Sequence, residues 1–187
     1  MKYIFNTLLL IPLLFFTLNS YSQSRSSIGI SFGYNVPVSN NDYKIGGGGS
    51  IQGAIALGDK WAILPSIGIE NMNSKGRTIY GPYGYPTGHI QDITLIYIGA
   101  AVKYSFDSKL FAKAGAMLYV GAGGDDVAAA GPGGSVAFGY NLDLDRHSSL
   151  QLYLNTDVVY VEPISGNGIT PVVSLNLAYV FNFRGLK

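Results

Sequence analysis

The sequence predicts an all-β protein: an eight-stranded, antiparallel, up-and-down β-barrel that spans a membrane and is preceded by a cleaved signal peptide. Three observations predict this fold. Apolar side chains alternate with small or polar ones in eight segments, as in strands that have one apolar face. The connections between the segments alternate in length, as the turns and loops of a membrane barrel do. Charged residues are only 12% of the chain, about half the usual share, which suits a wall covered by lipid.

The chain begins with the pattern of an export signal. Lys2 supplies a positive start, Leu8 to Leu18 form an apolar run, and Ser20-Tyr21-Ser22 provide the small residues of a cleavage site. The apolar run has about half the roughly 20 residues that a membrane-spanning helix needs. We therefore expect residues 1–22 to be a signal peptide and residues 23–187 to form one barrel domain.

Charge and cysteine content exclude several partners and cross-links. Of the 12 basic residues Lys2 leaves with the signal peptide, so 11 basic residues remain against 11 acidic ones. Nothing in this balance favours nucleic acid as a partner. The chain has no cysteine, which excludes a disulfide and a lipid-modified cysteine anchor.

The first three segments are separated by turn-forming residues. They run from Ile28 to Val36, from Ile51 to Leu57 and from Trp61 to Ile69. Pro37 ends the first, Gly46 to Gly49 form a flexible lead into the second, and Gly58-Asp59-Lys60 turn the chain into the third. Because Pro65 cannot donate a ladder hydrogen bond, we expect the third strand to be bulged or loose there.

The other five segments are likewise separated by turns and loops. They run from Ile93 to Tyr104, Leu110 to Val120, Val136 to Leu142, Leu150 to Tyr160 and Val172 to Phe183. Met72 to His89 and Gly121 to Gly134 are expected loops, Phe106 to Lys109 and Asp143 to Ser148 are turns, and Glu162 to Thr170 are of medium length. Segments of about 9 to 12 residues match the length of a tilted strand that crosses a bilayer.

The parity of each segment predicts which side chains face lipid. In the last segment Val173, Leu175, Leu177, Tyr179, Phe181 and Phe183 share one parity, and Ser174, Asn176, Ala178 and Asn182 share the other. With the apolar parity outward, the strand charges Glu70, Lys103, Lys113 and Asp157 all point inward. Lysine facing lipid at mid-membrane would cost about 2 to 4 kcal/mol, so this register is the favourable one.

The inward and interfacial positions predict a filled tube with aromatic girdles. Eight strands leave room only for side chains, and here these include the larger Tyr97, Met117 and Tyr153. The aromatic residues near strand ends are Trp61, Tyr104, Phe106, Phe181 and Phe183 at the turn end, with Tyr34 and Tyr160 at the opposite end. Such positions are typical of the membrane–water interfaces.

With eight such strands and aromatic residues at the end of the last one, the chain resembles the small outer-membrane barrels of the OmpA and OmpX type from Gram-negative bacteria. The resemblance implies a place in the cell outer membrane, contact with its lipids, and insertion by the outer-membrane barrel assembly machinery. It also implies that Tyr179, Phe181 and Phe183 act as an assembly signal. Members of this family are structural or adhesive, resist host defences or, in a few cases, modify lipids, so the fold selects no activity.

The tyrosine-rich loop offers the strongest candidate for a functional surface. Tyr80, Tyr83 and Tyr85 stand between glycine and proline residues, and such rigid amphipathic rings are favoured in recognition surfaces. The favoured hypothesis is a non-enzymatic barrel with a structural role, or one that recognises an unknown extracellular ligand through its loops.

The sequence predicts no catalytic residue, cofactor or metal. His89 and His147 lie at opposite ends of the barrel, so they cannot share a site. Asp125-Asp126 offer too few oxygens for calcium, and Gly46 to Gly49 lack the Lys-Ser/Thr of a phosphate-binding loop.

Two alternatives belong to other functional classes. His89 with Asp92 and Ser74 could serve an outer-membrane lipid-modifying enzyme. A soluble, periplasmic, lipocalin-like barrel would instead turn the apolar parity inward around an apolar ligand.

Overall fold

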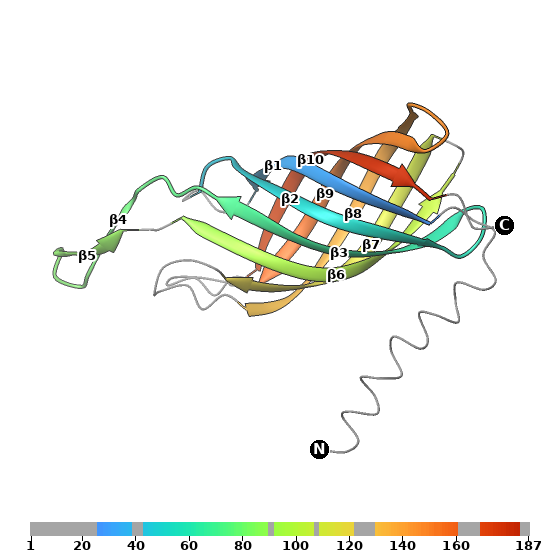
Figure 1. Cartoon of the computed structure of the whole chain (residues 1–187). Coiled ribbons are helices and arrows are strands. Elements are labelled where there is room, and N and C mark those ends of the chain that lie inside the picture. Colours follow the sequence, from blue (N-terminus) through green and yellow to red (C-terminus); the bar gives the residue numbers. More distant parts are fainter. Residues whose placement is uncertain are drawn as a thin grey trace, which may run out of the picture.

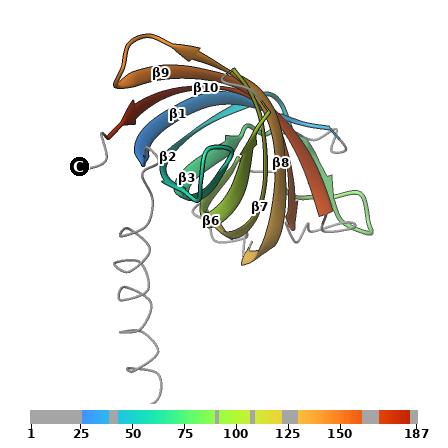
Figure 2. The same ribbon diagram turned by 90° about the vertical axis from the view of Figure 1, so that its right-hand side faces the viewer.

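The computed structural model describes residues 26–38, 43–89, 92–106, 109–121, 130–160 and 169–183. In these residues eight strands close into an antiparallel barrel (Figures 1 and 2). The strands are β1 (Ser27–Pro37), β2 (Gly46–Ala56), β3 (Trp61–Met72), β6 (Ile93–Ser105), β7 (Leu110–Gly121), β8 (Ala130–Asp143), β9 (Ser148–Tyr160) and β10 (Ile169–Asn182). Each pairs with its neighbours along the chain, and β1 pairs with β10 to close the ring. The predicted fold class is therefore confirmed.

Several strand boundaries differ from the sequence-based expectation, and one hairpin was not expected. Gly46 to Gly49 belong to β2 rather than to a flexible lead, because they pair with β1 and partly with β3. A Cβ atom at Gly46 would collide with the carbonyl of Asn71, so close backbone approach explains a glycine there. β8 begins at Ala130, inside the expected loop. A hairpin of β4 (Thr78–Tyr80) and β5 (Pro86–His89) lies in the expected loop before β6.

The apolar side chains of the barrel strands face outward, as expected. Exposed outward residues include Phe32, Ile67, Ile98, Leu118, Val136, Leu154 and Leu177. Their inward neighbours Ser31, Ala137 and Tyr153 are buried. The lipocalin-like alternative required the apolar parity to face inward, so the structure contradicts it.

The ladder between β2 and β3 is interrupted beside Pro65. Pairing runs as far as Gln52 with Ser66 and resumes at Ile55 with Ile63. On the other side of β3, Pro65 remains in register with Ala100 of β6. The expected looseness at Pro65 is thus confirmed, and it is confined to the β2 side, where a proline has no N–H to donate.

The short turns gather at one end of the barrel, called the turn end below. The backbone N–H of Ser105 donates to the carbonyl of Lys60 over 2.8 Å, and that of Phe183 donates to Ser26 over 2.8 Å. In the β8–β9 turn, hydrogen bonds from the Ser148 side chain and from the backbone N–H groups of His147 and Ser148 hold the pKa of Asp145 below its ordinary value. The connections at the opposite end, the loop end, include the β4–β5 hairpin (Figure 1).

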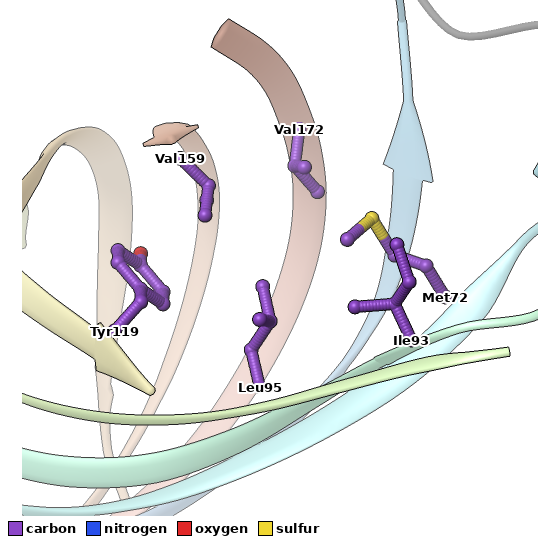
Figure 3. Packing of buried hydrophobic residues seen from close by; sticks show 6 residues of the cluster. All are labelled: Met72, Ile93, Leu95, Tyr119, Val159 and Val172. Carbon is purple, nitrogen blue, oxygen red and sulfur yellow. The ribbon is translucent and has the colours of Figure 1, made fainter. Parts of the chain in front are cut away.

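Two clusters of buried apolar side chains lie inside the barrel. The first consists of Met72, Ile93, Leu95, Tyr119, Val159 and Val172 (Figure 3). Met72 ends β3 and Ile93 begins β6, so this cluster fills the loop end. The second consists of Phe111, Ala137, Tyr153, Ala178 and Val180, toward the turn end.

Among the described residues no helix is long and apolar enough to span a membrane.

Candidate functional site: outer wall, charged interior and tyrosine hairpin

A chain of aromatic rings runs along the outside of the turn end. The ring centroids of Trp61 and Tyr104 are 4.6 Å apart, those of Tyr104 and Phe106 are 5.0 Å apart, and those of Phe106 and Phe138 are 6.2 Å apart. Trp61 is on β3, Tyr104 on β6 and Phe138 on β8, so the rings cross neighbouring strands. Phe138 was not among the interfacial aromatic residues predicted from the sequence. The sequence shows which face of the strand Phe138 occupies, but it does not show how far along the barrel axis the residue lies.

The aromatic residues of the last strand also lie on the outer wall. Tyr179, Phe181 and Phe183 are all exposed. The Phe181 and Phe183 centroids are 5.5 Å apart, and His147 of the β8–β9 turn stacks on Phe181 at 6.3 Å. At the loop end Tyr34 is exposed, whereas the side chain of Tyr160 lies outside the described residues. These rings therefore occupy the surface that meets the membrane interface.

The four strand charges point into the barrel, as expected. Glu70 and Asp157 are buried, and the amide nitrogen of Asn155 donates to the Asp157 carboxylate over 2.5 Å. The two lysines lie against aromatic rings: Lys113 Nζ is 3.4 Å from the Tyr153 centroid, and Lys103 Nζ is 4.3 Å from that of Phe111. Cation–π contact stabilises a desolvated ammonium group, and the sequence alone gave no sign of it.

The β4–β5 hairpin projects from the loop end of the barrel (Figure 1). Its turn is held by hydrogen bonds from the N–H of Gly81 to the Tyr85 carbonyl over 2.9 Å and from the N–H of Gly84 to the Gly81 carbonyl over 3.0 Å. Gly84 has a φ of 76°, which a residue with a side chain rarely adopts. Gly81 and Gly84 therefore shape the turn.

The three expected recognition residues are exposed together on this hairpin. Tyr80 is 66% exposed, Tyr83 is 89% exposed and Tyr85 is 74% exposed. Both Lys75 and Arg77 precede the hairpin, and residues 73–89 contain no acidic residue. The hairpin thus exposes three tyrosine rings, and the segment that carries them has basic but no acidic side chains.

The base of the hairpin is tied to the preceding connection. The N–H of Lys44 donates to the Asn73 carbonyl over 2.7 Å, and the side-chain nitrogen of Asn73 donates to the Ile45 carbonyl over 3.0 Å. Tyr43 forms a backbone bridge with Ser74. These bonds fix where the hairpin leaves the barrel.

Of the three residues of the enzymatic alternative, Ser74 and Asp92 are in contact, and His89 contacts Thr78. The Asp92 carboxylate accepts a hydrogen bond from the backbone N–H of Ser74 over 2.7 Å, and the Ser74 hydroxyl accepts one from the N–H of Gly76 over 2.9 Å. His89 Nδ1 faces the Thr78 hydroxyl at 3.2 Å across the hairpin. These bonds stabilise the hairpin and its base.

Within the described ranges, no group of three or more histidine, cysteine, aspartate or glutamate residues could hold a metal ion. Asp125-Asp126 and the expected signal peptide at residues 1–22 lie outside the described residues.

Comparison with known proteins identifies the fold. No protein-family model matches the chain, and no curated protein matches its sequence. The outer membrane protein OprG from Pseudomonas aeruginosa is similar in structure with a TM-score of 0.55 and 12% identity, over 86% of this chain and 97% of OprG. Neisserial surface protein A gives a TM-score of 0.54 and 16% identity over 87% and 98% of the two chains. Ail, the attachment invasion locus protein of Yersinia pestis, gives 0.52 and 12% over 87% and 100%.

The comparisons and the outer wall lead to the same conclusion. The similar structures share the architecture of small outer-membrane barrels. Independently, the exposed apolar residues of this barrel form a surface that water would not cover favourably. The chain therefore has an outer-membrane barrel fold, with a wall that contacts lipid.

Proposed function

We propose that this outer-membrane barrel is a non-enzymatic surface protein with a filled interior, and that the β4–β5 hairpin is its recognition surface. One observation carries the proposal: Tyr80, Tyr83 and Tyr85 are highly exposed on a turn that projects beyond the barrel. A monomeric protein gains nothing in stability from rings held in solvent, whereas rigid aromatic side chains make strong binding contacts at low entropic cost.

The same proposal assigns assembly roles to the ends of the chain. Residues 1–22 direct export, and Tyr179, Phe181 and Phe183 on the outer wall of the last strand present the signal that the barrel assembly machinery recognises. The exposure of all three rings on one face of β10 supports the second assignment, because that face presents an unbroken aromatic stripe.

Binding of the whole protein to an array of glycans and extracellular-matrix proteins tests the recognition role. The wild-type barrel in liposomes is compared with a triple variant in which Tyr80, Tyr83 and Tyr85 become serine. We expect wild type to bind at least one spot and the triple variant to bind it at least about tenfold more weakly, as for loss of central aromatic contacts.

A matched control separates ring contact from other effects. In a second triple variant the same three residues become phenylalanine, which keeps the rings, and we expect it to retain most of the binding. The proposal fails if wild type binds nothing on the array, or if the serine variant binds as wild type does while both are folded.

A further inference from the structure

A small polar cavity lies inside the barrel between the two apolar clusters. Its volume is about 30 Å³, and its lining includes Ser31, Asn35, Glu70, Tyr97, Asn155 and Asn176. The side-chain groups of this lining are a carboxylate, hydroxyls and amides, with no lysine or arginine among them. The space is enough for about two water-sized occupants.

Two buried polar atoms beside this cavity have no hydrogen-bond partner among the described residues. They are the Nδ2 atom of Asn35 and the Oε2 atom of Glu70. Asn35 is 2% exposed and Glu70 is 8% exposed. Burying such groups unpaired is costly, so their occurrence together points to an occupant.

Asn35 and Glu70 both line the cavity, and both lie beside Gly48, which lines it too. A Cβ atom built on Gly48 would lie 3.1 Å from Asn35 Nδ2 and 3.3 Å from Glu70 Cγ. Glycine at this position therefore leaves the gap between the amide and the carboxylate open. A larger residue would fill the space in which both groups could be satisfied.

Among the residues that line the cavity Glu70 is the only acid and none is basic, so its carboxylate has no counter-charge within the lining. Asp157, another acid, also acts electrostatically on Glu70, and Asp157 in turn interacts with Lys113. The interior ammonium groups of Lys103 and Lys113 lie against the rings of Phe111 and Tyr153. A buried carboxylate next to a like charge is stabilised by an added positive charge.

The neighbouring amides leave oxygen atoms for such a cation. The side-chain nitrogen of Asn155 donates to Asp157, and that of Asn176 donates to the Ser174 hydroxyl over 2.8 Å. Asn155 and Asn176 both line the cavity, and with these nitrogens engaged their amide oxygens are the remaining polar atoms of the two side chains. Carboxylate, amide and hydroxyl oxygens are the ligands that hard cations prefer.

We propose that the cavity binds one small monovalent cation, such as sodium, through the Glu70 carboxylate, together with one water molecule. The water oxygen coordinates the cation and accepts a hydrogen bond from Asn35 Nδ2, so both unpaired groups are satisfied. A single carboxylate in the lining matches a single charge, and the volume matches one ion and one water. This site is independent of the hairpin and of its proposed role.

Thermal unfolding of the folded barrel in a zwitterionic detergent tests the proposal. Unfolding is followed by the gel shift between folded and unfolded forms, in sodium chloride and in choline chloride at equal ionic strength. Choline is too large for the cavity. We expect sodium to raise the unfolding midpoint in a saturable way, by on the order of 3 °C at tenfold excess over the dissociation constant.

Two variants link the effect to the cavity. Glu70→Gln keeps the size of the side chain but removes its charge, and we expect its midpoint to be the same in both salts. Asp59→Asn removes an exposed charge from the β2–β3 turn and should respond to sodium as wild type does. The same midpoint for wild type in both salts would overturn the proposal, as would a full sodium response in Glu70→Gln.

A measurement on the unmodified protein covers the case in which Glu70→Gln does not fold. Crystals grown in sodium chloride should show, beside the Glu70 carboxylate, a density peak whose distances to the surrounding oxygen atoms are those of a sodium ion, shorter than those of a hydrogen-bonded water. Distances typical of water at every peak in the cavity would show that it is merely hydrated and would overturn the proposal.

Discussion

At the scale of single residues, glycines and large rings form matched pairs inside the barrel. The Tyr97 ring covers Gly68, and a Cβ atom at Gly68 would lie 2.5 Å from Tyr97 Cζ and 2.7 Å from the Gly49 carbonyl oxygen. The sequence predicted that Tyr97 points inward. It could not predict that Tyr97 touches Gly68, because the two residues meet across the β3–β6 ladder, in register with each other.

The Gly68 contact predicts the effect of a single methyl group. Gly68→Ala forces Tyr97 and the Gly49 backbone apart, and overpacking of this kind costs about 1 to 3 kcal/mol. The free energy of unfolding, measured by urea titration in lipid vesicles, should fall by that amount. Gly47→Ala is the matched control, because the nearest atom to its Cβ would be the Gly33 carbonyl oxygen at 3.6 Å. Equal stability of the two variants would contradict the packing described here.

The interior charged residues show a second limit of prediction from sequence at the scale of single residues. Parity alone placed Glu70, Lys103, Lys113 and Asp157 inward, and the structure agrees. The partners of these groups were not predictable. They depend on the register between strands and on side-chain reach, so ring contacts for the lysines appear only in three dimensions.

At the scale of elements, the period-two pattern located all eight barrel strands. It succeeded because one face of each strand meets lipid and the other meets a packed interior, which imposes strict alternation. The pattern failed at Gly46 to Gly49, because glycines have no side chains that could alternate. These residues form a strand through their pairing with β1 and β3. The β4–β5 hairpin was missed because it lies outside the membrane wall and needs no alternation.

Alternation along β10 predicts opposite tolerance on its two faces. Leu175 is 53% exposed and pairs with the outward Leu154, so Leu175→Lys places an ammonium group in lipid. We expect a loss of about 2 to 4 kcal/mol and a sharp drop in the folded fraction after insertion into lipid vesicles. Leu175→Ile, which stays apolar, and Asn176→Ser, which stays polar on the inner face, should both fold. Normal insertion of Leu175→Lys would mean that the assigned faces are reversed.

At the scale of the whole molecule, closure of the ring makes the apolar wall stable in a membrane. β1 pairs with β10 along its whole length, from Ser27 opposite Asn182 to Pro37 opposite Val172. The eight described strands of the ring therefore leave no edge that exposes unpaired backbone groups to lipid. The alternation of short and long connections predicted this topology from sequence, whereas the candidate recognition surface was predicted only as a tyrosine-rich loop without its hairpin geometry.

Heat modifiability of the mature chain, residues 23–187, tests the membrane-barrel account most directly. The chain is refolded with and without detergent, and its circular dichroism and gel migration are recorded before and after boiling. The account predicts a β-rich spectrum and a heat-dependent change in migration in detergent, with neither in plain buffer. A soluble, monomeric β protein in plain buffer with unchanged migration would contradict it, because the exposed apolar wall described here could not remain in water.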